Sequence, residues 1–494
     1  MARGVEARLV STSLSMMLGL LILALIGDGG FRVLSRLRVV QARSPEEWLG
    51  LRILVALALV PAILLAFDLT GVPIGRVSVG SFAALLFGAA FAWNRLRPGS
   101  EADRQSSGTR QQPKRSWSAE LRDRLTELRR APVAIVLILA TASYAIGSFA
   151  YVLSRPPWVY DGAVGWDVVA KVMSYEGKVR SSVFTELQFN AQCVYAPFTS
   201  HNQGYWYLFT PDTPRIWVAL LVTGFCLVVW SRFRSYTGSP TAAGLITFLL
   251  FTPPNLTFHL TVAQTDMPTM VFTTLAFLAA AEFARKEAGI LPVIFFSLVA
   301  SASRTEGVLF ATAITVILLL YRKREGLVAL WVGAASALFF AFWNLFFIKH
   351  LIGYDPGAYF RDSITIDFGR IAEVLTRAAQ IVSTRGFYGE LIWIIVSLPV
   401  VWVLGRWGGG KGWWSDSPTR RYLGPLALIL ALSFVFYMPF FYMWNDQLNP
   451  LWTMEHTFKR GFFRFVPVLV FLWVSSPPVL GFLKKTEGRP GTSA

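Results

Sequence analysis

The chain has few charged residues and few cysteines, and the shortage of charge limits which class of protein it can be. Only 15% of its 494 residues are Asp, Glu, Lys or Arg, whereas 54% are hydrophobic, and the mean hydropathy is +0.50. No single soluble core could bury so much apolar surface. The composition therefore excludes an ordinary soluble domain and predicts a membrane protein.

The two cysteines and four histidines do not form a recognisable site. Cys226 falls inside an apolar segment and Cys193 falls in a polar loop, which argues against a disulfide between them. The histidines are scattered without the spacing of metal ligands: His201, His259, His350 and His456. The glycine-rich stretch near residue 410 follows an apolar segment rather than a strand, so it does not indicate a nucleotide-binding loop.

Apolar segments dominate the rest of the chain. Most are close to the roughly 20 residues that one helix needs to cross about 30 Å of hydrocarbon. They lie at residues 11–28, 51–67, 78–94, 132–153, 215–231, 241–255, 267–284, 290–303, 306–321, 327–348, 388–405, 423–441 and 462–482. The sequence therefore predicts an all-α polytopic membrane protein with about thirteen transmembrane helices.

The basic residues indicate how these helices are oriented. Residues 95–131 contain ten Lys or Arg, and the positive-inside rule places this loop in the cytoplasm. Alternation then puts the N-terminus and two long loops, 154–214 and 349–387, on the external face of the plasma (inner) membrane. It also assigns 29 of the 46 basic residues to cytoplasmic loops. Because insertion topology explains the net charge of +17, we expect no nucleic-acid partner.

Four parts are expected along the chain. Transmembrane helices occupy residues 1–94, the basic loop residues 95–131, a transmembrane core residues 132–482, and a cytoplasmic tail residues 483–494. Within the basic loop, one face of a predicted helix carries Trp117, Leu121, Leu125 and Leu128. This pattern is typical of an interfacial helix, and a short solvated helix fits it equally well. The external loop 154–214 is expected to be partly helical.

Alternation also brings ionisable residues from distant segments to the external face. They are Asp161, Asp167, Lys171, Asp266, Arg304, Glu306, Glu455, His456, Arg460 and Arg464. Ionisable groups at or near membrane depth are costly and are usually retained for a binding site or a pathway. Simpler roles are also open, because an isolated Asp can cap a helix and basic residues can contact lipid headgroups.

The order of these residues resembles the GT-C class of polytopic glycosyltransferases, which use polyprenyl-phosphate sugars. In several bacterial branches of that class, a long external loop opens with an Asp and continues with an aromatic residue, an Ala-Lys pair and a Tyr-Pro element. Similar residues here are Asp161, Trp166, Ala170-Lys171 and Tyr195-Ala-Pro197. Three later turns resemble elements of the class through Asp266-x-Pro268, Arg304-x-Glu306-Gly307 and Glu455-His456 followed by Arg464 and Pro467. Gly162 stands where many members carry a second acid, and the first three spans look like an addition to the usual core.

The resemblance implies a fold, a reaction and roles for particular residues. It implies a GT-C-like core in which Asp161 is the general base that accepts a proton from the acceptor. Arg304 and Arg464, with Lys171 and Arg460, would neutralise the leaving phosphate. The remaining substrate-binding candidates are Trp166, Tyr195, Asp266, Glu306, Glu455 and His456.

The expected partners follow from the same resemblance. The donor would be a polyprenyl-phosphate sugar, held among membrane lipids, and the acceptor a cell-envelope glycan, lipid or protein. No metal ligand is assigned, and the need for a divalent cation stays open. Two other functions fit the pattern less well: a lipid-linked glycan ligase or polymerase, and a secondary transporter.

Overall fold

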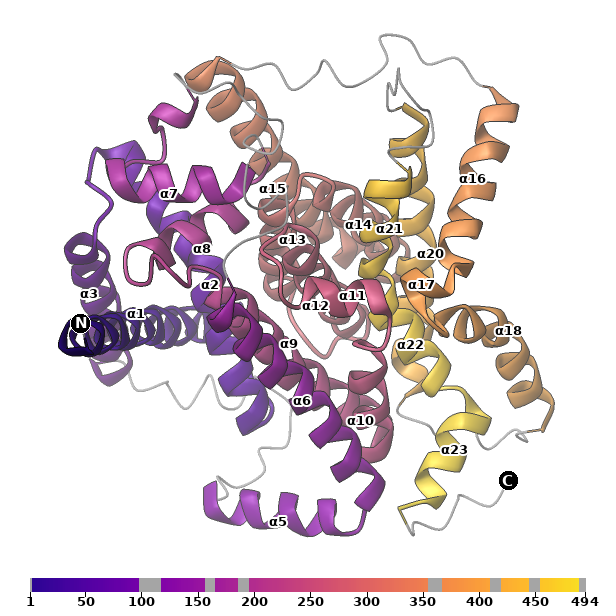
Figure 1. Ribbon diagram of the computed structural model, residues 1–494. Helices are drawn as coiled ribbons and strands as arrows, with labels where there is room; N and C mark the ends of the chain where they lie inside the picture. Colours follow the sequence, from indigo (N-terminus) through magenta and orange to yellow (C-terminus); the bar gives the residue numbers. More distant parts are fainter. Residues whose placement is uncertain are drawn as a thin grey trace.

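The computed structural model describes residues 2–96, 117–155, 165–184, 195–353, 367–408, 419–443 and 454–487. The described residues form helices, turns and connecting segments, with no β-strand among them. Figure 1 shows the helices as one assembly with α12 near its centre. Asp161 and Cys193 lie outside the described residues, and Cys226 is a free cysteine.

Among the described residues, eight helices are long and apolar enough to cross a membrane, and the bent pair α22 (Val466–Val474) and α23 (Pro477–Lys485) counts as a ninth if it forms one span. The eight are contained in α1 (Ala2–Arg36), α2 (Pro45–Thr70), α3 (Arg76–Leu96), α6 (Pro132–Ser154), α9 (Ile216–Thr237), α12 (Asp266–Ala284), α15 (Leu330–Phe340) with the segments that flank it, and α20 (Arg420–Met443). The structure thus confirms an all-helical protein with membrane-spanning helices. The number of thirteen transmembrane spans stays a prediction.

The other predicted spans coincide with helices that are short or broken. They are α10 (Pro240–Leu249), α13 (Leu291–Ser303), α14 (Gly307–Arg322), α18 (Leu391–Gly408), and the pair α22 (Val466–Val474) and α23 (Pro477–Lys485). At 1.5 Å per residue, α10 covers only about 15 Å, roughly half of the hydrocarbon layer. It stops before Pro253 and Pro254, and α11 (Pro254–His259) follows. Between α22 and α23 the chain bends by 69° at Ser475 and Ser476, directly before Pro477, because proline cannot continue the backbone hydrogen bonding of a helix.

The two long loops and the basic loop contain helices of their own. Loop 154–214 contains α7 (Asp167–Glu176), the short η2 (Ser182–Phe184) and α8 (Phe198–Tyr207), so its described part is partly helical, as expected. Loop 349–387 contains α16 (Phe368–Ser383) and α17 (Arg385–Tyr388), and the basic loop contains α5 (Trp117–Arg129). In Figure 1, α5 lies across the lower edge of the bundle and α16 stands at its upper right.

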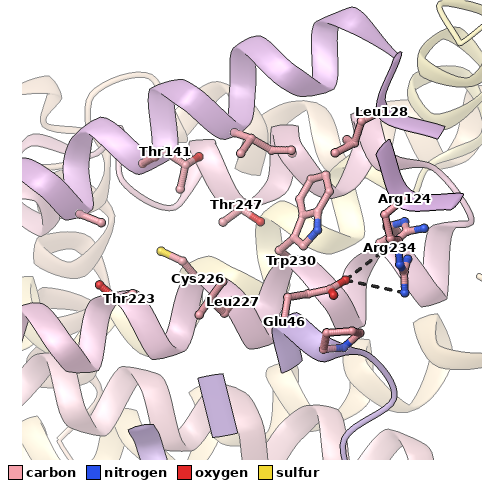
Figure 2. A pocket seen from close by; sticks show the side chains of 15 residues that line it. Glu46, Arg124, Leu128, Thr141, Thr223, Cys226, Leu227, Trp230, Arg234 and Thr247 are labelled. Atoms are coloured by element: carbon pink, nitrogen blue, oxygen red, sulfur yellow. Dashed lines mark ion pairs between the residues drawn. The ribbon is translucent and has the colours of Figure 1, made fainter. Parts of the chain in front are cut away.

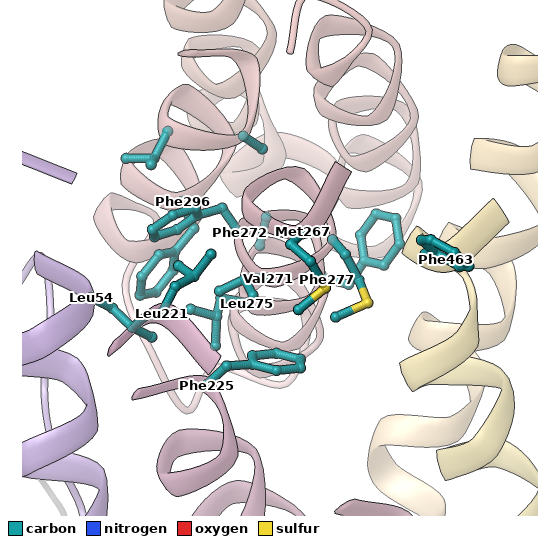
Figure 3. Packing of buried hydrophobic residues seen from close by; sticks show 14 of the residues in the cluster. Leu54, Leu221, Phe225, Met267, Val271, Phe272, Leu275, Phe277, Phe296 and Phe463 are labelled. Carbon is teal, nitrogen blue, oxygen red and sulfur yellow. The ribbon is translucent and has the colours of Figure 1, made fainter. Parts of the chain in front are cut away.

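Helix α12 forms the centre of the packing. In the stretch of α12 that is apolar enough to span a membrane, 94% of the residues are buried. The helix packs against α13, α14, α20 and α9. Figure 3 shows Val271, Phe272 and Leu275 of α12 facing Leu221 and Phe225 of α9. Within a membrane such contacts stabilise mainly through close packing, because lipid chains are as apolar as the side chains they would replace.

The N-terminal helices join this core through a close helix contact. A Cβ added to Gly50 of α2 would lie 2.6 Å from the carbonyl oxygen of Gly224 in α9, so only glycine permits this approach of the two backbones. Small residues at such crossings are typical of membrane helices. Helices α1, α2 and α3 pack on one another beside the core, on the left of Figure 1.

The two ends of α12 define the two ends of the assembly. We call them the Asp266 end and the Glu282 end, after the charged residues near the first and last turns of this helix. Each end carries a buried group of charged side chains. The two groups differ in how completely their charges are paired.

Candidate anion site at the Asp266 end

The Glu282 end carries a closed ionic network. Arg232 of α9 contacts Glu47 at 2.7 Å and Glu282 at 3.0 Å, and Arg43 contacts Glu282 at 2.8 Å. Tyr236 donates a further hydrogen bond to Glu282. Two arginines balance two glutamates, and the network ties α2, α9 and α12 together. Its completeness indicates a structural role.

The Asp266 end carries a second cluster, whose positions are set by three separate segments of the chain. Asp266 lies in the first turn of α12, where a negative charge is favourable beside the helix N-terminus. Arg304 and Glu306 lie in the turn between α13 and α14, and Arg460 and Arg464 lie in the short helical turns α21 (Lys459–Gly461) and η8 (Phe462–Arg464) before α22. We call these five residues the Asp266 cluster.

Gly307 lets the turn between α13 and α14 close tightly. A Cβ at this position would lie 2.5 Å from the backbone nitrogen of Ser301, so a larger residue would force the two helices apart. The close approach fixes the preceding residues, and Arg304 reaches from this turn to Asp266 at the start of α12 while it also pairs with Glu306. The Arg-x-Glu-Gly pattern thus has a geometric basis here.

The ion pairs of the cluster centre on Arg304. Its guanidinium contacts Asp266 at 2.6 Å and Glu306 at 2.6 Å. Arg464 lies farther from the same carboxylates, at 4.0 Å from Asp266 and 3.8 Å from Glu306. Arg460 lies 3.8 Å from Asp266 and donates a hydrogen bond to the carbonyl oxygen of His456. Three arginines face two carboxylates, so the cluster has a formal charge of +1.

Arg464 is the unusual member of the cluster. Its exposed fraction is 0%, yet none of its guanidinium nitrogens makes a hydrogen bond with the described residues. Its carbon Cζ lies 5.3 Å from the ring centres of both Phe310 and Tyr437, and such aromatic faces attract a cation. A guanidinium has five N–H donors, and burying them without acceptors is costly. This side chain is therefore held in place by its neighbours, while no described residue accepts a hydrogen bond from it.

Tyr195 extends the cluster towards the loop 154–214. The Arg304 guanidinium lies 5.5 Å from the Tyr195 ring, and this ring lies 5.7 Å from that of Trp166. Burial raises the pKa of Tyr195 above its usual value, so the hydroxyl stays protonated and able to donate. Two aromatic residues of the loop thus lead from α7 to the arginines.

The predicted site residues fall into two groups. Asp266, Arg304, Glu306, Arg460 and Arg464 are brought together, with Tyr195 and Trp166 beside them. Lys171 is exposed on α7, and Glu455 pairs with Arg377 of α16 instead of the cluster. His456 is exposed and contributes its backbone oxygen to Arg460. The proposed base, Asp161, lies outside the described residues.

The sequence did not single out two neighbours of the cluster. Tyr437 lies inside the predicted span 423–441 and had no feature that distinguishes it from a packing residue, yet its ring supports Arg464. Phe310 is equally inconspicuous in α14. The Glu282 network had a detectable signal, because an acid within an apolar span is costly unless it is paired.

Metal binding finds no support in the described part of the chain. Among these residues there is no group of three or more His, Cys, Asp or Glu side chains that could hold a metal ion. One carboxylate oxygen of Asp266 and one of Glu306 lie 2.6 Å from Arg304.

Comparisons of the chain with protein-family profiles, curated proteins and solved structures found no match. The function is therefore inferred from the residues and their geometry.

Proposed function

We propose that this protein is a membrane glycosyltransferase that moves a sugar from a polyprenyl-phosphate donor to a cell-envelope acceptor on the external face of the plasma membrane. The observation that carries the proposal is the buried, positively charged Asp266 cluster with the uncommitted donors of Arg464. A phosphate at the membrane surface is an anion that such donors suit, because arginine binds phosphate through two parallel hydrogen bonds.

The reaction assigns one role to each group. The bond between the sugar carbon and the phosphate oxygen breaks, and its electron pair leaves with the polyprenyl phosphate. The acceptor oxygen bonds to the sugar carbon and gives its proton to Asp161. Arg464 and Arg304 stabilise the charge that develops on the leaving phosphate, which is where preorganised donors contribute most to catalysis.

The sequence position of Asp161 agrees with this role. It lies five residues before Trp166, and Trp166 contacts Tyr195, which in turn contacts Arg304. The resemblance to GT-C enzymes joins the same residues through four motifs that are far apart in the chain. Three of those motifs contribute Asp266, Arg304, Glu306 and Arg464 to one cluster.

A ligase or polymerase is supported less well. That function would need free basic residues in the loop 349–387. In the described part of this loop, Arg377 pairs with Glu455 and Arg385 lies 3.6 Å from Glu390. Arg370 lies over the ring of Tyr442. We therefore retain sugar transfer as the function that the geometry supports best.

Replacing Arg464 tests its role in phosphate binding while the fold stays intact. We expect Arg464→Gln to lower glycan modification by about 10²- to 10³-fold, the typical cost of losing one preorganised donor. Because Arg464 makes no hydrogen bond with the described residues, expression and the melting temperature should stay close to native values. Mass spectrometry of cell-envelope glycans from a deletion strain that carries each variant measures the effect.

The matched control is Arg385→Gln, which removes an exposed arginine near the same end of the chain's core. This variant should give native amounts of product. Equal product from Arg464→Gln and the native protein would remove Arg464 from the phosphate site. A deletion strain with an unchanged glycan profile would reject sugar transfer itself.

The external orientation has an independent test. Tyr175 of α7 is 77% exposed, and Leu125 of α5 is 51% exposed. In a variant without Cys193 and Cys226, Tyr175→Cys in intact cells should react with a membrane-impermeant maleimide, whereas Leu125→Cys should react only after the cells are broken open. The reverse pattern would place the Asp266 cluster on the cytoplasmic side and contradict a lipid-borne donor.

A further inference from the structure

A groove at the opposite end of the assembly has no part in the proposed reaction. It encloses about 400 Å³ between α5, α6, α9 and α10, with the start of α2 at its polar end. Figure 2 shows Thr141, Thr223, Cys226, Leu227, Trp230 and Thr247 along the groove and Glu46, Arg124 and Arg234 together at one end.

The walls of the groove are apolar even where threonines line it. Each threonine hydroxyl donates a hydrogen bond to a backbone carbonyl oxygen of its own helix. The acceptors are Leu137 for Thr141, Ala219 for Thr223 and Ala243 for Thr247. The threonine methyl groups are the parts left for contact. Because the threonine hydroxyls are already bonded, these walls offer few partners to an ordered water, so a hydrocarbon is the occupant that they suit.

The length of the groove matches one leaflet of a bilayer. Its lining on α9 runs from Thr223 to Arg234, and the eleven steps between these residues cover about 16 Å along the helix. This is about half of the hydrocarbon thickness of roughly 30 Å. A groove of this length has room for one acyl chain, which reaches from the headgroup level to the bilayer centre.

Charged side chains mark the boundary end. Glu46 lies 3.6 Å from Arg234 and 3.8 Å from Arg124, and Arg234 also pairs with Glu127. The two arginines and two glutamates at this end balance one another, and α5 itself holds as many acids as basic residues. The positive charge comes from the whole basic loop, in which residues 95–131 contain ten Lys or Arg and five Asp or Glu, and such a loop attracts anionic lipid headgroups.

We propose that this groove binds one acyl chain of an anionic phospholipid from the leaflet on the α5 side, with the lipid phosphate held by Arg124 and Arg234. The bound chain fills the space between α6 and the pair α9–α10. Leu128 of α5 covers the groove near its mouth, which makes α5 an interfacial helix rather than a solvated one. The site is separate from the Asp266 cluster and does not depend on the proposed reaction.

Lipid titration of the full-length protein, freed of lipid in detergent and followed by native mass spectrometry, tests the proposal. The probes are phosphatidylglycerol and phosphatidylethanolamine with identical acyl chains. The native protein should bind one phosphatidylglycerol saturably and more tightly than phosphatidylethanolamine. Absence of a saturable site, or equal affinity for the two lipids, would overturn the proposal.

Two matched pairs of variants locate the site. Ala142→Phe fills the groove and should weaken binding of phosphatidylglycerol by about tenfold, which corresponds to about 1.4 kcal/mol. Ala150→Phe, on an exposed position of the same helix outside the groove, should leave binding unchanged. Arg124→Gln should remove the preference for the anionic lipid, whereas Arg122→Gln, exposed on the same helix, should preserve it.

The same variants can also give results that contradict the proposal. Native affinity in Ala142→Phe would show that the lipid binds elsewhere, and an equal effect of the two arginine variants would show non-specific attraction to α5. If Ala142→Phe fails to fold, Ala145→Phe fills the same groove from the next turn of α6 and carries the same expectations.

Discussion

Asp161→Asn is expected to abolish glycan modification while the protein still accumulates and inserts in the membrane. The amide has nearly the shape of the carboxylate but cannot accept the proton of the acceptor hydroxyl. Loss of a general base typically costs about 10²- to 10⁴-fold in rate, so the product should fall below detection in the glycan profile of a complemented deletion strain.

The control for this variant is Asp212→Asn. Asp212 is an exposed acid in the same predicted external loop, and its replacement should leave the product at the native level. If Asp161→Asn gives native amounts of product, Asp161 is not the base. A deletion strain complemented with the native gene would then show whether sugar transfer itself still holds.

Arg304→Met is expected to destabilise the whole protein. Arg304 holds both Asp266 and Glu306 at 2.6 Å in a buried position. Without Arg304 both carboxylates lose their close cation, because Arg460 and Arg464 lie 3.8 to 4.0 Å from them, and breaking a buried ion pair typically costs about 3–5 kcal/mol. The melting temperature in detergent should fall by several degrees, and less of the variant should reach the membrane.

Further substitutions distinguish this electrostatic cause from lost packing. Adding Glu306→Gln to Arg304→Met removes one stranded carboxylate and restores the native formal charge of +1, so part of the lost stability should return. Arg385→Met disrupts only an exposed pair with Glu390 and should cost no more than about 1 kcal/mol. A melting temperature of Arg304→Met equal to the native value would show that the cluster does not hold α12, α13 and α14 together.

Much of the helical architecture could be predicted from hydropathy and charge. Long apolar segments such as the one that became α2 leave few alternatives, because backbone groups in hydrocarbon must be satisfied within the segment. The helix in the basic loop was predictable from the spacing of Leu121, Leu125 and Leu128. The bend before Pro477 and the break at Pro253 were not, because proline in a membrane helix is compatible with a kink, a break or an unbroken span.

The composition of the Asp266 cluster was also partly predictable. Alternation of cytoplasmic and external loops assigns Asp266, Arg304 and Arg464 to the same face of the membrane, and this assignment needs only the topology. The pairing of these residues was not predictable, because it depends on how α12, α14 and η8 pack. The support of Arg464 by Tyr437 likewise needed the three-dimensional arrangement, since one tyrosine in an aromatic span resembles any other.

The two buried charged groups differ in how completely their charges are paired, and this difference assigns the proposed reaction to the Asp266 end. The Glu282 network pairs two arginines with two glutamates at hydrogen-bond distance. The Asp266 cluster has one more arginine than it has acids, and Arg464 makes no hydrogen bond with the described residues. A buried donor left unsatisfied is costly unless a ligand or another segment accepts from it.

The most direct test of this account is a structure of the full-length protein determined with polyprenyl monophosphate in a lipid nanodisc. The account predicts phosphate density within hydrogen-bond distance of Arg464 at the Asp266 end, with the carboxylate of Asp161 facing the same space. Phosphate bound at the Glu282 end, or Asp161 on the side of the protein away from Arg464, would contradict it.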